Sequence, residues 1–287
     1  MNKVAIFIFT VVWSLNLQAQ KGNSLAQQIE AAYKPVGNTG YFANSCECTV
    51  AEYQKFLSDP SGVNERYRYD STNWGVPGVT SFNNDPLTRV YYNHPAYQNY
   101  PINNVSQTAA QAYCEWLTNA YNADPKRKYK KVVFRLPTES EWNTAALGNN
   151  PDPSIKKVFP WPGLTLQGKD GKRLANYAEA GEYNIKRDAQ GNLVINTGNY
   201  GFGLNYGADN YIYTSPCNNS FPANDFGLHN ISGNVAEFTQ DMGKTKGGSY
   251  VSPGYYLMVQ TYVPEFPNMQ AGASYIGFRP FMFILEK

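Results

Sequence analysis

The sequence predicts one large domain in which helices occupy the first half of the chain and short strands joined by long loops occupy the second. Several segments before residue 148 begin with a capping residue and continue with apolar residues at helical spacing. From Phe159 onward the chain is dense in Gly, Asn, Pro and Tyr and has only short apolar runs. No repeat or low-complexity linker divides the chain, which indicates a single domain.

Helices are expected over residues 24–33, 49–57, 106–121 and 138–147. Thr49, Ser106 and Thr138 stand at the expected N-cap positions, and Glu141 completes a capping box with Thr138. Trp142 should face inward, and Arg135 is free to pair with a carboxylate. Strands are expected over 132–136, 247–251 and 278–285. Residues 46–48 also look like a strand.

Composition and charge exclude some classes of protein. The chain has 287 residues and a formal charge of +2, and residues 126–131 form its one basic cluster, which we interpret as a solvated loop. A nucleic-acid partner is therefore not expected. Residues 1–19 read as a signal peptide and residues 20–287 as the mature domain, with no later apolar stretch long enough to span a membrane. We expect an exported protein in the periplasm, at the outer membrane or outside the cell.

The four cysteines of the chain are Cys46, Cys48, Cys114 and Cys217. An oxidising compartment permits disulfides, but four cysteines allow three pairings and the sequence does not select one. Cys46 and Cys48 would share one face of a strand, and a bond between them would be strained. The interpretation that we favour is two packed thiols, or one thiol bridging elsewhere.

Seven sequence blocks follow one another between Cys48 and Pro280. They are CTVAEY, YPINNVS with AQAYCEWL, RLPTESEW, FPWPG, FPANDFGLHNISGNVAEF, KGGSY and IGFRP. In this order they resemble the motifs of the formylglycine-generating-enzyme (sulfatase-modifying factor) superfamily. The resemblance implies an α+β domain with that superfamily's fold, a complex variant of the C-type-lectin-like fold that is rich in loops and has short strands and a few helices.

The segment from Asn230 to Glu237 is chemically the most specific. It combines amide, backbone carbonyl and carboxylate oxygens, which Ca²⁺ prefers, although an Asx-turn with a satisfied buried Glu would read the same way. The resemblance implies one structural calcium site at Asn230, Gly233, Val235 and Glu237, with backbone oxygens from Gly233 and Val235. It implies a second site at Asn176, Tyr177, Asp209 and Tyr211, where the tyrosines contribute carbonyls.

The catalytic groups of the superfamily are missing. Its oxidase binds copper through two cysteines, and the resemblance places Ser252 and Leu257 at these positions. Another branch uses three histidines to hold iron, whereas this chain has only His94 and His229. Ser249, Ser252 and Tyr256 remain in the cleft without an evident base. We therefore expect a protein that is not an enzyme.

The resemblance is strongest, around residues 91–101, to gliding-motility and type IX secretion members of the superfamily. It implies a non-catalytic exported scaffold or interaction protein, an accessory subunit of such a cell-envelope assembly, with other envelope proteins as partners. One alternative is a calcium-dependent module that binds a carbohydrate, a glycan or a peptide. A second alternative is an enzyme with altered chemistry in the same cleft.

Overall fold

The structure is a computed structural model that describes residues 22–74, 86–149, 157–180, 185–187, 189–190, 193–195, 204–205, 210–211, 213–217, 220–261, 265–266 and 268–287. The predicted signal peptide, residues 1–19, and the predicted calcium ligand Asp209 lie outside these ranges.

The four predicted helices are confirmed, and each begins one residue after the start of its predicted range, because that first residue is the N-cap. They are α1 (Leu25–Ala32), α2 (Val50–Leu57), α4 (Gln107–Ala123) and α5 (Glu139–Leu147). The side chains of Thr49, Ser106 and Thr138 each accept a hydrogen bond from the backbone amide three residues on. A short helix that was not predicted, α3, spans Pro86–Val90, and 3₁₀ turns span Val63–Tyr67, Pro95–Tyr97 and Gly254–Leu257.

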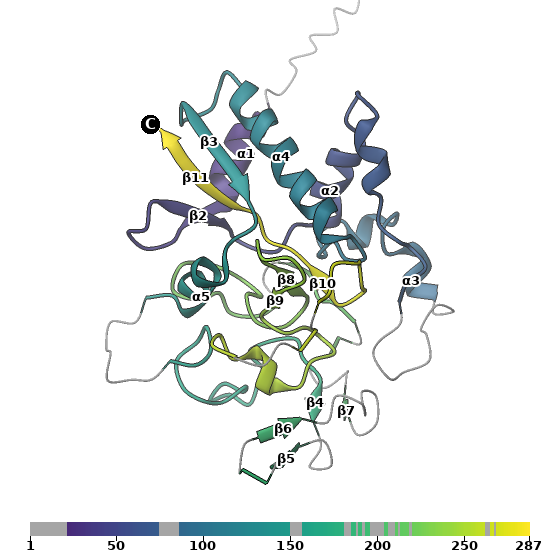
Figure 1. Ribbon diagram of the computed structural model, residues 1–287, viewed down its shortest axis with the longest axis vertical. Coiled ribbons are helices and arrows are strands. Elements are labelled where there is room, and N and C mark those ends of the chain that lie inside the picture. Colours follow the sequence, from purple (N-terminus) through teal and green to yellow (C-terminus); the bar gives the residue numbers. More distant parts are fainter. Residues whose placement is uncertain are drawn as a thin grey trace, which may run out of the picture.

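The main sheet is antiparallel and has the strand order β1-β2-β11-β3. Its strands are β1 (Tyr33–Pro35), β2 (Tyr41–Asn44), β3 (Lys131–Arg135) and β11 (Phe281–Glu286). The C-terminal strand β11 therefore lies between two strands from the first half of the chain. Figure 1 shows α1 and α4 beside this sheet, and α4 packs against β3.

The second half of the chain forms smaller sheets. β8 (Ala236–Phe238) pairs with β9 (Thr245–Lys246) and, in parallel, with β10 (Ile276–Gly277). Two further pairs, β4 (Glu179–Ala180) with β7 (Leu204–Asn205) and β5 (Ile185–Arg187) with β6 (Leu193–Ile195), lie at the end of the molecule opposite α4 (Figure 1).

Two of the predicted strands are wrong. Residues 247–251 form none, because Gly247 and Gly248 have φ angles of +93° and +66°, outside the range of extended backbone. The chain around Cys46 and Cys48 bends after β2 ends at Asn44. The backbone of Cys48 instead makes hydrogen bonds with the backbones of Phe278 and Ile102, so the chain there does not continue the direction of β2. The strand predicted over 278–285 starts later, at Phe281.

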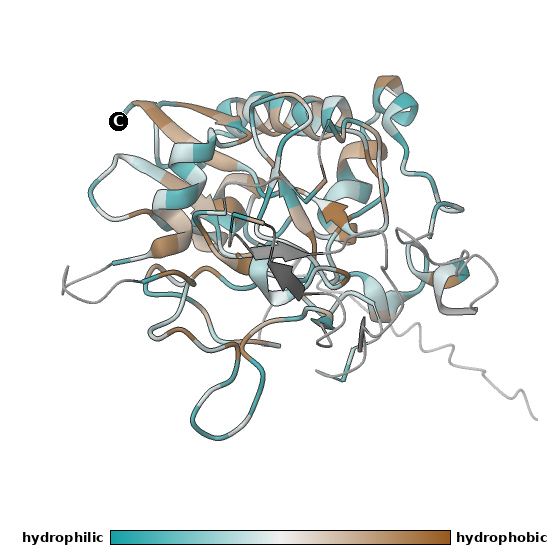
Figure 2. Cartoon of the chain, turned by 60° about the horizontal axis from the view of Figure 1, so that its bottom comes forward, coloured by the Kyte–Doolittle hydropathy of each residue, from teal (hydrophilic) through white to brown (hydrophobic). Residues whose placement is uncertain are grey.

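The core between the helices and the main sheet is rich in aromatic rings. Tyr53 of α2 stacks on Tyr113 of α4 with ring centroids 5.8 Å apart, and Phe278 meets both rings edge-on. Figure 2 shows hydrophobic residues concentrated on the strands and hydrophilic residues on the outer loops. Trp142 faces inward as predicted and is fully buried.

A buried ion pair joins the main sheet to the loop-rich half. Arg279, fully buried just before β11, contacts the Glu237 carboxylate of β8 at 2.8 Å. The guanidinium also donates to the carbonyls of Asn44 and His229, each at 2.8 Å. Trp142 of α5 donates to the other oxygen of Glu237 at 2.8 Å. These bonds satisfy both charges without water, as buried ions require.

Across the described part of the chain, no helix is long and apolar enough to cross a membrane.

We expect Arg279→Leu to lower the free energy of unfolding by about 3–5 kcal/mol, because the buried Glu237 carboxylate would lose its guanidinium partner. Arg135→Leu is the matched control. Arg135 makes a bidentate pair with Glu141 in partly solvated surroundings, so its loss should cost about 1 kcal/mol. Urea unfolding of both variants measures the two costs. Equal costs would contradict the central role of Arg279.

Candidate functional site

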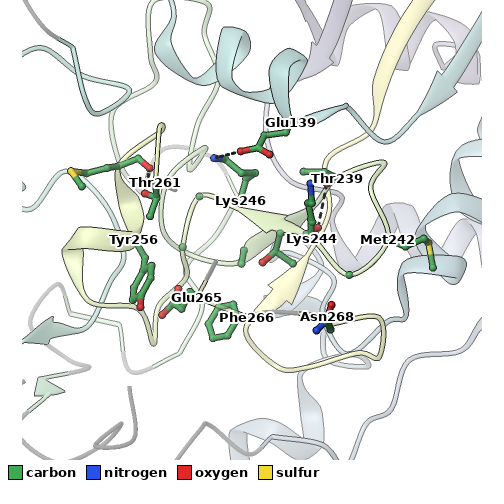
Figure 3. Close-up of a pocket in the computed structure, with 16 residues that line it drawn as sticks. Glu139, Thr239, Met242, Lys244, Lys246, Tyr256, Thr261, Glu265, Phe266 and Asn268 are labelled. Atoms are coloured by element: carbon green, nitrogen blue, oxygen red, sulfur yellow. Dashed lines mark hydrogen bonds and ion pairs between the residues drawn. The ribbon is translucent and has the colours of Figure 1, made fainter. Parts of the chain in front are cut away.

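A cavity of about 290 Å³ opens beside the segment that resembles the superfamily's catalytic region. Figure 3 shows Lys246 and Glu139 on one side of it and Tyr256, Glu265 and Phe266 on the other. Lys246 pairs with Glu139 at 3.2 Å, and burial lowers the pKa of its ammonium group. Burial, helped by the charge of Glu265, raises the pKa of Tyr256 to about 12.

Ser252 is held in a closed hydrogen-bond set next to this cavity. Its Oγ accepts from the backbone amide of Ser249 at 2.7 Å, lies 3.0 Å from the Ser249 hydroxyl, and donates to the Glu265 carboxylate. Ser249 and Ser252 are both fully buried. Glu265 is thus a carboxylate partner of Ser252 that the sequence did not reveal, and the hydroxyl that it binds is buried.

Leu257 is also fully buried. It packs with Phe159, Ala175 and Tyr177 beneath the glycine turn. Gly248 has a left-handed φ of +66°, which favours glycine, and a Cβ there would lie 2.9 Å from Cδ1 of Leu257 and 3.1 Å from the carbonyl oxygen of Tyr256. Leu257 therefore fills an apolar space beneath the loop.

These two residues do not fit a copper ion. Cu(I) selects soft thiolate ligands, whereas Ser252 offers a hydroxyl already committed to internal bonds and Leu257 offers a hydrocarbon. No cysteine follows Cys217 in the sequence, so none stands at either position.

The turn that carries the first predicted calcium site is strongly bent. Asn230, Gly233 and Asn234 all have left-handed φ angles, of +52°, +84° and +64°. A Cβ on Gly233 would lie 2.4 Å from the carbonyl oxygen of Asn176, so only glycine permits this approach. The amide of Asn234 donates to that carbonyl at 2.8 Å. The structure thus brings Asn176, from the second predicted site, against the turn of the first.

Glu47 is a carboxylate at this turn that the sequence analysis did not select. It is fully buried, accepts from Nδ2 of Asn234 at 2.8 Å and lies 3.5 Å from Nδ2 of Asn230. Burial raises the pKa of Glu47 to about 8, although Arg279 opposes this shift. Glu47 stands between two cysteines, and no local sequence pattern there indicated its contact with the asparagines.

Among the residues that the structure describes, two amide oxygens in this cluster have no hydrogen-bond partner. Oδ1 of Asn230 and Oδ1 of Asn176 are both buried and unpaired, whereas Nδ2 of each asparagine donates to a backbone carbonyl, of Pro216 or Tyr213. Unpaired buried oxygens are costly, and a hard cation is one partner that would satisfy them.

The other predicted calcium ligands lie in different surroundings from one another. Val235 follows directly in the turn, and Glu237 already pairs with Arg279, so a calcium ion there would share this carboxylate with a guanidinium. Tyr177 is buried and its hydroxyl accepts from Arg173, while Tyr211 is half-buried beside Phe221. Asn230 and Asn176 are the predicted ligands whose surroundings best fit Ca²⁺, which stays a prediction.

Comparison with known proteins places these features in a family. A model of the sulfatase-modifying factor enzyme 1-like domain matches residues 15–281. The chain is 25% identical over 299 residues to the formylglycine-generating enzyme of Mus musculus, covering 89% of this chain and 69% of that protein. It is 27% identical over 223 residues to the inactive C-alpha-formylglycine-generating enzyme 2 of Bos taurus, covering 68% and 56%.

Among solved structures, PvdO from Pseudomonas aeruginosa aligns with a TM-score of 0.52 and 17% identity, covering 85% of this chain and 80% of that chain. At this level of identity the likeness shows the fold alone. Together with the family match, it confirms the predicted α+β fold.

Calcium is expected to stabilise the protein by about 2.7 kcal/mol when its concentration is 100-fold above the dissociation constant. Asn230→Ala should remove most of this gain, because it deletes an unpaired buried oxygen. Asn149→Ala, at an exposed asparagine, is the control and should keep the gain. Thermal unfolding with calcium and with a chelator measures both. An unchanged calcium effect in Asn230→Ala would rule out the predicted ligand.

Proposed function

The chain belongs to the sulfatase-modifying factor enzyme 1-like family and has the formylglycine-generating-enzyme fold, and we propose that it is a non-catalytic member that serves as an exported scaffold or interaction protein. The observation that carries this proposal is the state of the two positions where the family's oxidase has its copper ligands. Ser252 is buried and hydrogen-bonded to Ser249 and Glu265, and Leu257 is packed in a buried apolar cluster.

Both side chains are integrated into the packing and hydrogen bonding of the fold. Ser252 fixes the turn at Ser249 and anchors Glu265, and Leu257 supports Gly248. The bovine relative whose name marks it as inactive supports the idea that this fold persists without the family's oxidation. Fold alone does not assign activity, so the argument rests on these side chains.

We expect no oxidation of the cysteine in a sulfatase-derived peptide when the purified protein is incubated with copper and oxygen. The reason is that no thiolate pair stands at the positions of Ser252 and Leu257. Mass spectrometry of the peptide detects the aldehyde product, and the mouse relative, named as a formylglycine-generating enzyme, is the positive control. Turnover by this chain would refute the non-catalytic assignment and favour the altered-enzyme alternative.

The proposed setting is the cell envelope, in an assembly of the gliding-motility or type IX secretion kind. The sequence supports it through the predicted signal peptide and through residues 91–101, whose tyrosines pack into a continuous aromatic group. Tyr91 and Tyr92 of this group are buried, so Tyr97 and Tyr100, which are half-buried, are the rings that could contact a partner. Tyrosine suits protein interfaces because it offers a large contact area with few rotatable bonds.

A second candidate function is ligand binding, and one cavity favours it. This aromatic cavity, of about 220 Å³, is lined by Trp74, Tyr91, Tyr97, Tyr100, Tyr211 and Tyr213, with Thr88, Asn210 and Thr214 as polar neighbours. Tyr91 and Trp74 meet edge-on with centroids 4.9 Å apart. Ring faces with a few hydroxyl and amide groups suit a sugar ring better than a cation, since no carboxylate lines the cavity among the described residues.

Affinity purification of the tagged protein from detergent-solubilised envelopes separates the two candidates. A scaffold should elute in a defined complex with other envelope proteins, identified by mass spectrometry. Elution as a lone monomer would contradict the scaffold. A glycan array then tests the second candidate, for which Tyr100→Ala should lose the signal and Tyr255→Ala, outside the aromatic cavity, should keep it.

A further inference from the structure

One loop of the molecule concentrates positive charge. Residues 126–130, which we call the basic loop, connect α4 to β3 and contain three lysines and one arginine among five residues. Lys126, Lys128 and Lys130 are all exposed, in agreement with the solvated loop that the sequence indicates. Figure 1 shows this connection at the same end of the molecule as α1.

The backbone of the basic loop is fixed by hydrogen bonds at several points. The guanidinium of Arg127 folds back and donates to the carbonyls of Asp124 and Lys130, at 3.0 and 3.2 Å. The amide of Lys128 donates to the carboxylate of Glu30 on α1 at 2.6 Å. The loop is thus tied to itself and to α1, and it presents its lysines in a defined arrangement.

The three lysine ammonium groups are not neutralised within the fold. Among the residues that the structure describes, none of them forms an ion pair with a carboxylate. The carboxylates of Asp124 and Glu30 at the base of the loop accept hydrogen bonds from backbone amides. The ammonium group of Lys128 lies over the ring of Tyr129, 5.2 Å from its centroid. The charge of the loop is therefore directed to the outside.

The kind of cation in the loop indicates the kind of partner. Arginine is enriched at protein interfaces and lysine is depleted there. The guanidinium of Arg127 is already bound to the backbone, so lysines carry the outward charge. An ammonium group is a mobile point charge on a flexible stem, which suits a diffuse layer of anionic headgroups. Lys131, the first residue of β3, stands opposite Glu286 of β11 and adds little to this charge.

The place of the loop in the fold also favours a membrane surface. The amide of Ala26, in the first turn of α1, donates to the carboxylate of Asp124 directly before the loop at 3.0 Å. The predicted signal peptide, residues 1–19, precedes α1 by only a few residues. A chain held in a bilayer by that segment during export therefore has the basic loop on the side nearest to the membrane.

We propose that the basic loop docks the exported protein on the anionic headgroups of a membrane surface. Lys126, Lys128 and Lys130 supply the attraction, and the domain stays outside the bilayer. This inference goes beyond the proposed scaffold function, because it rests on the charge and geometry of the loop and requires no partner protein. The affinity purification described above uses detergent in place of a bilayer, so the two proposals can fail separately.

Vesicle sedimentation tests the proposal. The protein is purified in the form that the cell exports and is mixed with vesicles of phosphatidylcholine alone or with about one-third phosphatidylglycerol. We expect it to sediment with the anionic vesicles only. Raising sodium chloride from about 0.05 M to about 0.5 M should release it, because salt screens the attraction. Equal sedimentation with neutral vesicles would indicate an apolar contact and would overturn the proposal.

Two triple variants with the same net charge assign the binding to the loop. The loop variant replaces its three lysines: Lys126→Gln, Lys128→Gln and Lys130→Gln. The matched control changes exposed lysines elsewhere: Lys55→Gln, Lys169→Gln and Lys172→Gln. The loop variant should bind anionic vesicles at least about tenfold more weakly than the wild type, and the control should bind like the wild type.

Equal weakening in both variants would show that net charge alone matters, and it would overturn the assignment to the loop. Failure of the wild type to sediment with the anionic vesicles would overturn the proposal as a whole and leave an acidic protein as the partner for these lysines. The wild-type result decides this point even where a variant fails to fold.

Discussion

The ion pair between Arg279 and Glu237 is the interaction on which the rest of the structure depends. A charge in the interior must be matched in place, so the residues around this pair cannot move independently. Arg279 donates hydrogen bonds to the carbonyl of Asn44, at the end of β2, and to the carbonyl of His229, directly before the turn of the first predicted calcium site. Glu237 accepts a hydrogen bond from Trp142 of α5. The long loops of the second half are thereby positioned relative to the main sheet with few regular strands.

In the cleft, the two positions that the resemblance assigns to copper ligands are occupied by buried side chains that bind and pack within the fold. Ser252 and Leu257 take over structural tasks, one by hydrogen bonding to Ser249 and Glu265 and the other by filling the space under Gly248. Both are buried, and the nearby cavity has its charged Lys246 paired with Glu139. The region therefore offers shape and polarity for binding, while the hydroxyl of Ser252 is buried.

The asparagine cluster is organised by backbone geometry as much as by charge. Left-handed residues in one turn place the amide nitrogens of Asn230 and Asn234 against the Glu47 carboxylate. The close approach of Gly233 to Asn176 joins the two predicted ligand sets. Amides carry no charge, so the cluster can be buried at moderate cost while its unpaired oxygens keep a preference for a cation.

By itself the sequence determined the helices and the family. Capping boxes such as Thr138 with Glu141 are set by residues three apart, and the motif blocks are contiguous, so both can be read along the chain. Only the tertiary structure placed Glu265 on Ser252 and Glu47 in the asparagine cluster. These contacts join distant loops whose course follows from left-handed turns and buried charges, and no local pattern in the sequence encodes them.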